Sequence, residues 1–474
     1  MPAKHNAKLP QPVFHEPIFS EDHPLPSPTG FATKHPSDSK TYDEVEKLLK
    51  KDVVNVPKSR IADADVFRLQ DAYGSNHGTK IADKIWSAKK IIFHALGDSG
   101  ASNVRKYGNE LRVSDQVTVD CHRSDERNQP AFLFHLGDVV YNFGESQYYY
   151  DQFYEPFRNY PGPIFAIPGN HDSFIVPGTP ANKRPLTTFQ RNFCADKPVI
   201  TPEAGSLHRT AMTQPGVYFT LDAPFVRVIG LFSNALEDPG VISNKDGKWP
   251  AVTDKQLKFL STQLRRIRNE KYKGAVLLAT HHPPYSYSPP PKQGGTGGNH
   301  GCSAAMLKQI DEVCLQEGVY PHAFLSAHAH NYQRYTRIIK FGKSEIDVPF
   351  IVCGDGGHNV NPIVRSSKGY TAEEPHPGSS AAHLESKKAA IRAKELLLEK
   401  YNDTNYGYLR IHVDKEQLRI GFHQVGRKHA GAVALRHGDS RPGRSHDGGE
   451  LDYAEISAVG LGTNRICTGP NCGR

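Results

Sequence analysis

The stretch Ile91-Ile92-Phe93-His94-Ala95-Leu96-Gly97-Asp98-Ser99-Gly100 decides the fold class of this chain. Its first six residues are mostly apolar, which is typical of a short strand buried on both faces, and the glycines mark the turn that ends it. Asp98 therefore directly follows the carboxyl end of a buried strand.

Four further apolar runs end in polar residues in the same way. They are Ala131–Leu136 before Gly137-Asp138, Ile164–Ile167 before Gly169-Asn170-His171-Asp172, Ala275–Ala279 before Thr280-His281-His282, and Ala323–Ser326 before Ala327-His328-Ala329-His330. The carboxyl ends of strands in an open α/β sheet converge on one crevice, so we expect these polar residues to meet.

Helical patterns lie between some of these strands. One is capped by Thr253, and another begins at Ser303 and stops at Gly318. Strands that alternate with helices predict an α/β fold with a largely parallel or mixed sheet, covered on both faces.

The composition limits the class of protein. The chain has 474 residues and a formal net charge of +8, and no apolar run is long enough to span a membrane. The start of the chain lacks the apolar region of a secretory signal, which predicts a cytoplasmic protein. The chain has no block of Lys and Arg of the kind that marks a nucleic-acid-binding surface. A moderate positive charge instead suits small anionic substrates. Seven cysteines without a CxxC pair favour neither a disulfide framework nor a thiolate zinc site.

Composition also suggests how the chain is divided. Residues 1–40 are predicted to be an extended polar arm, and residues 41–88 a helical N-terminal extension. The catalytic domain is expected at 89–424, with a helical insertion at 366–404 that is rich in Ala, Lys and Glu. Residues 425–474 are predicted to be a low-complexity tail.

The polar strand ends combine carboxylate, amide and imidazole groups. These ligands suit cations such as iron, zinc or manganese, and carboxylates can bridge two ions. A pair of ions about 3.5–4 Å apart can activate a shared water and hold phosphate oxygens, so the pattern favours hydrolysis of phosphate esters.

The ordered motifs Gly97–Gly100, Gly137–Tyr141, Gly169–Asp172, Thr280-His281 and Ala327–His330 resemble those of the calcineurin-like metallophosphoesterases. Within that superfamily they are most similar to the purple acid phosphatase branch. Most of the superfamily has Asp-x-His in the first motif, where this chain has Gly100. In the purple branch a tyrosine three residues after the bridging aspartate replaces the lost ligand, and Tyr141 stands at that offset.

The resemblance implies a four-layered α/β/β/α sandwich of mixed sheets with a dimetal site at the strand carboxyl ends. It also implies a set of metal ligands divided between two ions. Fe(III) would be held by Asp98, Tyr141 and His330, a divalent ion (Fe, Zn or Mn) by Asn170, His281 and His328, and both by Asp138. His281 is preferred to His282 because the family places the ligand two residues before a proline, here Pro283.

Three further residues receive roles from the resemblance. His171 is similar to the histidine that binds phosphate or donates a proton, and Asp172 could orient its ring. His300 resembles a substrate-contacting loop histidine, while His282 either faces the substrate or supports the ligands. By contrast, Gly354–His358 is interpreted as a strand-ending turn rather than as a further site.

The predicted function is hydrolysis of a small phosphomonoester by a metal-bound hydroxide with the assistance of His171. One alternative is a cyclic-nucleotide or other phosphodiesterase on the same scaffold. Another is a non-catalytic binding protein, which the complete ligand set disfavours. Since purple acid phosphatases are typically extracytoplasmic, the resemblance and the missing signal point to different compartments.

Overall fold

The computed structural model describes most of the chain between Asp65 and Thr468. The described residues are 65–141, 143–173, 186–234, 236, 239–249, 252–286, 303–361, 363, 379–380, 396–426, 450–457 and 465–468. The predicted arm at 1–40 lies outside them, as do residues 41–64 of the predicted N-terminal extension.

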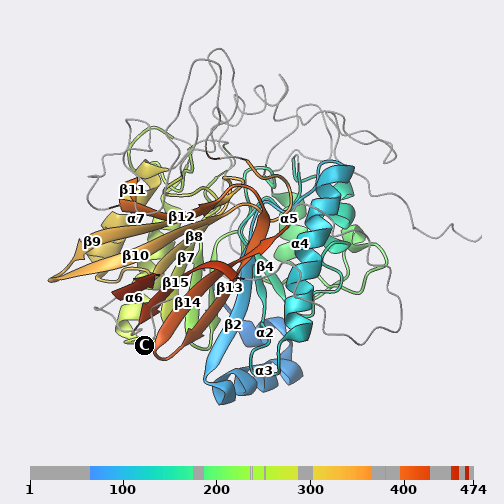
Figure 1. Cartoon of the computed structure of the whole chain (residues 1–474), viewed down its shortest axis with the longest axis horizontal. Coiled ribbons are helices and arrows are strands. Elements are labelled where there is room, and N and C mark those ends of the chain that lie inside the picture. The colour runs from blue at the N-terminus through green and yellow to red at the C-terminus, as the bar shows by residue number, and fades with distance from the viewer. Residues whose placement is uncertain are drawn as a thin grey trace, which may run out of the picture.

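Two mixed β-sheets form the centre of the fold (Figure 1). The nine-stranded sheet has the order β1 (Val66–Arg68), β5 (Phe219–Ala223), β6 (Val226–Gly230), β7 (Ala275–Ala279), β8 (Ala323–Ser326), β10 (Ser344–Cys353), β9 (Tyr332–Phe341), β12 (Leu396–Asn402) and β11 (Ser379–Ser380). The seven-stranded sheet has the order β16 (Arg465–Thr468), β15 (Glu450–Ser457), β14 (Gln417–Val425), β13 (Tyr406–Asp414), β2 (Lys90–Leu96), β3 (Leu133–His135) and β4 (Ile164–Ala166). Strands β2, β3 and β4 pair in parallel, as do β6, β7 and β8.

Helices cover the outer faces of these sheets, except for α2 (Leu69–Ala72) and α3 (Ser75–Ala88), which pack against the core between the sheets. The other described α-helices are α4 (Val104–Arg123), α5 (Thr187–Phe193), α6 (Lys255–Asn269) and α7 (Ala304–Glu317). Shorter turns are the 3₁₀ helices η2 (Ser146–Tyr148) and η5 (Pro202–Ala204) and the π-helix η3 (Tyr150–Tyr154). Helix α4 packs on the seven-stranded sheet beside β13, while α6 and α7 lie against each other over the nine-stranded sheet (Figure 1). No described helix combines the length and apolar composition that a membrane span requires.

The central strands β3, β4, β6, β7 and β8 are buried throughout, and their side chains alternate between two cores. In β7, Ala275 and Leu277 face the core between the sheets, whereas Val276 and Leu278 face the core under the helices. The two sheets meet directly where the rings of Tyr332 in β9 and Phe422 in β14 stack, with centroids 4.0 Å apart. The fold is therefore the predicted α/β sandwich of mixed sheets.

The two helices expected from the sequence are present. Helix α7 begins after Ser303 and ends at Gly318, whose φ of 66° is the left-handed conformation that glycine adopts easily. The residue that precedes α6 is Asp254, not the predicted cap Thr253. Both helices bury the face that the apolar pattern predicts.

Two predictions about the C-terminal third are wrong. The sequence predicts a helical insertion at 366–404, yet Leu396–Asn402 is strand β12, paired with β9. It also predicts a low-complexity tail from residue 425, yet Glu450–Ser457 and Arg465–Thr468 extend the seven-stranded sheet. Pairing with a preformed neighbour overrides weak local propensity in both cases.

The described part of the N-terminal extension is only partly helical. Helices α2 and α3 agree with the prediction for residues 41–88, but Val66–Arg68 forms strand β1 at the edge of the nine-stranded sheet.

Candidate metal centre

The residues that follow five strands lie together at one end of the two sheets. Strands β2, β3 and β4 of one sheet lead to Asp98, Asp138 and Asn170. Strands β7 and β8 of the other sheet lead to His281 and to the histidines before β9. The structure thus brings together all seven predicted ligands, each at most 7% exposed: Asp98, Asp138, Tyr141, Asn170, His281, His328 and His330.

Three of these residues form a first cluster around the Tyr141 phenol. Its oxygen donates to Asp98 Oδ1 at 2.9 Å and lies 3.3 Å from His330 Nε2. The same His330 nitrogen is 3.3 Å from Asp98 Oδ1. Oxygen and nitrogen atoms of three side chains therefore converge on one small volume.

A second cluster surrounds the Asn170 side chain. Asn170 Oδ1 lies 3.0 Å from His281 Nε2 and 3.1 Å from His328 Nδ1. The other ring nitrogen of His281, Nδ1, donates to the Leu136 carbonyl at 2.9 Å, which leaves Nε2 free of a proton when the ring is neutral. This tautomer is the one that a metal ligand requires.

Asp138 connects the two clusters. Its Oδ2 lies 3.4 Å from His281 Nε2, and the carboxylate also hydrogen-bonds the side chain of Tyr141 in the first cluster. Donor atoms of Asp138, His281 and His328 all lie within 4.8 Å of one another, as in a metal-binding group. This is the arrangement expected of a bridging carboxylate.

Glycines make room for the two carboxylates. A Cβ at Gly169 would lie 2.0 Å from Asp138 Oδ1, and a Cβ at Gly354 would lie 2.7 Å from Asp98 Oδ2. A larger residue at either position would push the carboxylate out of the cluster. The backbone is therefore shaped around these oxygens, and the donor set of carboxylate, phenol, amide and imidazole fits iron, zinc or manganese.

Gly100 and Tyr141 are spatial neighbours as well as related motif positions. A Cβ at Gly100 would lie 3.0 Å from Tyr141 Cδ2 and 2.5 Å from the Val139 carbonyl oxygen. The backbone of Tyr141 is held by Gln152, whose amide accepts from its N–H at 2.8 Å and donates to its carbonyl at 2.7 Å. Sequence analysis missed Gln152, because a lone glutamine in the short π-helix η3 carries no recognisable signal.

Burial and mutual charge shift the pKa values of these groups. Burial raises the pKa of Asp98 to about 8, with a further contribution from Asp138. Burial acts in the same sense on Asp138, but the charges of His281 and His171 outweigh it and lower its pKa. The pKa of His281 rises to about 9, because the Asp138 carboxylate outweighs burial. Without a cation, Asp98 and His281 therefore keep a proton near neutral pH, and metal ions could replace these protons.

His171 contacts the shared Asp138 and the Tyr141 ring. Its backbone N–H donates to Asp138 Oδ1 at 3.0 Å, and its ring packs on Tyr141 with centroids 4.3 Å apart. The prediction that Asp172 orients the His171 ring is wrong, because the described hydrogen bonds of Asp172 go to backbone groups. The Asp172 carboxylate instead accepts three backbone N–H groups, from Val139, Val140 and Gly169, and so fixes the loop that carries Asp138.

The structure describes His282, one of the two predicted substrate-binding histidines, but not His300. His282 is fully buried, with Nδ1 2.8 Å from Ser233 Oγ and Nε2 2.5 Å from the Leu236 carbonyl oxygen. Because protein groups engage both ring nitrogens, this geometry favours the supporting role and disfavours direct contact with substrate. His300 lies outside the described residues.

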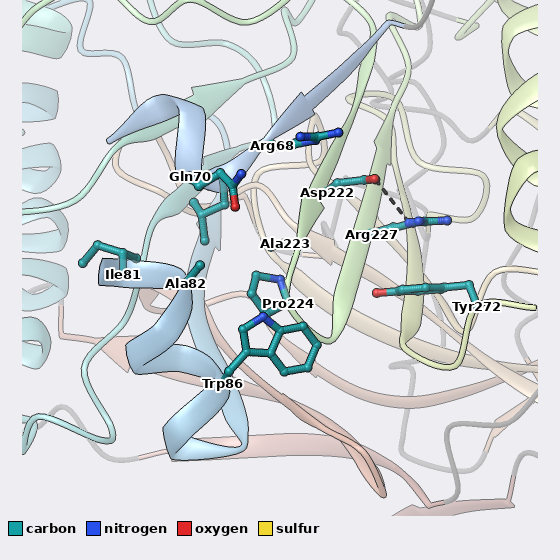
Figure 2. Close-up of a pocket in the computed structure, with 11 residues that line it drawn as sticks. Arg68, Gln70, Ile81, Ala82, Trp86, Asp222, Ala223, Pro224, Arg227 and Tyr272 are labelled. Carbon is teal, nitrogen blue, oxygen red and sulfur yellow. Dashed lines mark ion pairs between the residues drawn. The ribbon is translucent and has the colours of Figure 1, made fainter. Parts of the chain in front are cut away.

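A separate cavity of about 210 Å³ lies at the opposite end of the nine-stranded sheet (Figure 2). The turn after β5 lines it, with the exposed Trp86 of α3 beside Pro224 and an ion pair of 3.3 Å between Asp222 and Arg227. It contains none of the predicted site residues, so it is distinct from the metal centre.

Comparison with solved structures finds distant similarities in fold. The chain is 12% identical to GAP50, described as the anchor in the inner membrane complex of Plasmodium (TM-score 0.41; 71% of this chain and 85% of that chain). It is 11% identical to PhoD (TM-score 0.43; 81% and 72%). It is 12% identical to an uncharacterised predicted phosphoesterase from Streptococcus pneumoniae TIGR4 (TM-score 0.23; 71% and 90%). No curated protein matches the chain in sequence.

The family comparison is decisive. Residues 93–332, half of the chain, match the model of the calcineurin-like phosphoesterases, and this range includes every residue of the two clusters. Members of this family are phosphoric ester hydrolases with a dinuclear metal site. On this match, and with its motifs assembled into one buried cluster, the chain belongs to the calcineurin-like phosphoesterase family.

Proposed function

We propose that this chain is a phosphomonoesterase of the purple acid phosphatase-like branch. A ferric ion would be held by Asp98, Tyr141 and His330 in the first cluster. A divalent iron, zinc or manganese ion would be held by Asn170, His281 and His328 in the second, with Asp138 shared. The observation that carries the proposal is the position of the Tyr141 phenol oxygen, 2.9 Å from Asp98 Oδ1 and 3.3 Å from His330 Nε2.

The space around Gly100 supports this choice of branch. A histidine at position 100, as in the common Asp-x-His motif, would bring its Cβ within 3.0 Å of the Tyr141 ring. Its Cβ would also lie 2.5 Å from the Val139 carbonyl oxygen, so this backbone has little room for a side chain at position 100. An anionic phenol oxygen favours a trivalent ion, which is why iron is proposed for the first cluster.

Bound metal ions would lower the pKa of a water nucleophile and neutralise charge on the phosphate. The protein supplies the remaining parts of the reaction. Asp172 and Gln152 fix the loops that carry Asp138 and Tyr141, so the ligands need little rearrangement. His171, held against Asp138 and Tyr141, donates a proton to the leaving alkoxide.

The test combines elemental analysis with a visible spectrum of the purified protein. We expect iron and a second metal, a tyrosinate-to-iron absorption band, and loss of that band in Tyr141→Phe. A colourless, iron-free and fully active enzyme would contradict the branch assignment.

The substrate class is tested on the same sample. Phosphomonoesters should be hydrolysed with higher kcat/KM than bis-aryl or cyclic phosphodiesters. Preference for a diester would replace the monoesterase proposal with the phosphodiesterase alternative. Metal-loaded protein without turnover of either class would favour a binding protein.

A further inference from the structure

His358 covers one face of the Tyr141 ring and is paired with Lys106. Lys106 lies in the first turn of α4, and His358 follows β10, 252 residues later in the chain. Lys106 Nζ is 2.5 Å from His358 Nε2. The His358 ring stacks on the Tyr141 ring with centroids 3.4 Å apart and an interplanar angle of 19°.

The hydrogen bonds of His358 define its state. Its Nδ1 is 2.5 Å from the Gly100 carbonyl oxygen, which can only accept, so this nitrogen carries the proton. Its Nε2 then accepts from the Lys106 ammonium. The ring therefore has no free nitrogen for a metal, which agrees with the prediction that Gly354–His358 is not itself a ligand site.

Helix stability does not explain the position of Lys106. Asn103 caps α4 by accepting the Lys106 N–H at 3.0 Å, which places Lys106 in the first turn of the helix. A cation there opposes the helix dipole. Lys106 is also only 8% exposed, and its charge lowers the pKa of His330, although burial is the larger cause. The Lys106 charge thus acts on the first cluster, although its position in the first turn destabilises the helix.

We propose that Lys106 and His358 are positioning residues for Tyr141. His358 fixes the plane of the phenol ring, and Lys106, acting through the imidazole, draws electron density from it. The inference deepens the proposed function and rests on Tyr141 being a metal ligand. The pair would set how strongly the phenol oxygen donates to the metal, and thereby the rate of the reaction.

The test uses the holoenzyme and three variants. Lys106→Met removes the charge and keeps a long side chain, Lys106→Arg keeps the charge, and Arg105→Met removes the exposed cation one position earlier in the same turn. Metal content, melting temperature, the visible absorption band, kcat and KM are measured for each.

The expected pattern differs from that of a structural defect. Lys106→Met should keep its metals and melting temperature, shift the band to longer wavelength, and lower kcat about tenfold with little change in KM, as for other residues that tune metal ligands. Lys106→Arg should restore both band and kcat, and Arg105→Met should match wild type. His358→Phe, which retains a stacked ring but cannot link Lys106 to Gly100, should behave as Lys106→Met does, and it decides the question if Lys106→Met does not fold.

Contrary outcomes separate the two proposals. A wild-type band that neither Lys106→Met nor His358→Phe moves overturns the positioning role alone. An equal shift in Arg105→Met also overturns it, since general charge would then be the cause. A metal-loaded wild type with no tyrosinate band overturns both Tyr141 as an iron ligand and this inference.

Discussion

Asp98, Asp138 and His328 have left-handed backbone conformations, with φ angles of 55°, 55° and 66°. Such angles are uncommon for residues other than glycine and cost of order 1–3 kcal/mol each. Other described residues, such as Lys89 and Phe225, also have positive φ, but these three are the ones at which a ligand side chain leaves the end of a strand. Each strained residue therefore turns its side chain toward the cluster at some cost to stability.

His171 is the residue whose proposed chemical role is most open to kinetic analysis. In His171→Ala, an ester with a poor leaving group should lose rate by about a hundredfold, because its alkoxide needs a proton in the transition state. An activated aryl ester should lose much less. The measurement is kcat/KM for an alkyl and a nitrophenyl phosphate, and equal losses would indicate phosphate binding in place of proton donation.

Glu145 provides a pH-dependent contribution to stability away from the ligands. It is 3% exposed, and burial raises its pKa from 4.5 to about 7, although the Phe143 N–H, 3.1 Å from Oε2, opposes the shift. The unfolded chain ionises near pH 4.5, before the folded chain does. Stability from this group is therefore fully present below pH 4.5 and is lost as the pH rises to about 7.

Glu145→Gln should remove that loss. Relative to wild type, the variant should gain about 3 kcal/mol in free energy of unfolding between pH 4.5 and pH 8. Chemical denaturation at both pH values measures the difference, with the exposed Glu126→Gln as control. Parallel pH profiles for wild type and Glu145→Gln would show that the buried group does not titrate as described.

At the scale of elements, strand β15 joins the two sheets through one carboxylate. Asp452 accepts from Arg334 of β9 in a bidentate pair, at 2.7 and 2.9 Å, and from Tyr332 at 2.9 Å. Arg334 is only 4% exposed. This ion pair crosses from the seven-stranded to the nine-stranded sheet, so β15 is part of the core architecture.

Asp452→Ala should therefore be strongly destabilising. It leaves a buried guanidinium without its partner, which typically costs 3–5 kcal/mol, whereas a pair near the surface is worth about 0–1 kcal/mol. The matched control is Glu450→Ala, also in β15, which removes the partly exposed partner of Arg419 in β14. Similar melting temperatures for the two variants would show that the link between the sheets contributes little.

At the scale of the molecule, the metal centre draws its ligands from both sheets. Asp98 and Asp138 follow strands of the seven-stranded sheet, while His281 and His328 follow strands of the nine-stranded sheet. Ions bound there would act as cross-links at the edge of the sandwich. The proposed metal ions would therefore contribute to the stability of the fold as well as to the reaction.

Removing the metals should lower the melting temperature by several degrees, because ligands that bind only the folded state stabilise it. The loss should be reversed by adding iron and zinc back to the chelated protein. The Asp138→Asn variant, which lacks the shared carboxylate, should show a much smaller response to chelation. A melting temperature independent of chelator in wild type would argue against a metal link between the sheets.

Much of the site could be predicted from sequence. Buried strands that end in Gly-Asp or in histidine pairs have a local signature. The family resemblance, through the position of Pro283, selected His281, whose Nε2 lies near Asn170 while both nitrogens of His282 are engaged elsewhere. These features are local because a strand, its turn and its ligand occupy about ten consecutive residues.

Other features were decided only by the tertiary structure. Strands β12 and β15 have little local β signal and form because an adjacent strand offers unpaired backbone groups. Lys106 and His358 pair although they are 252 residues apart, and His358 stacks on Tyr141. The sequence alone therefore determined the fold class and the ligand candidates, since short-range patterns encode strand ends. Which groups surround those ligands was decided by packing, since contacts between distant segments leave no periodic trace in the chain.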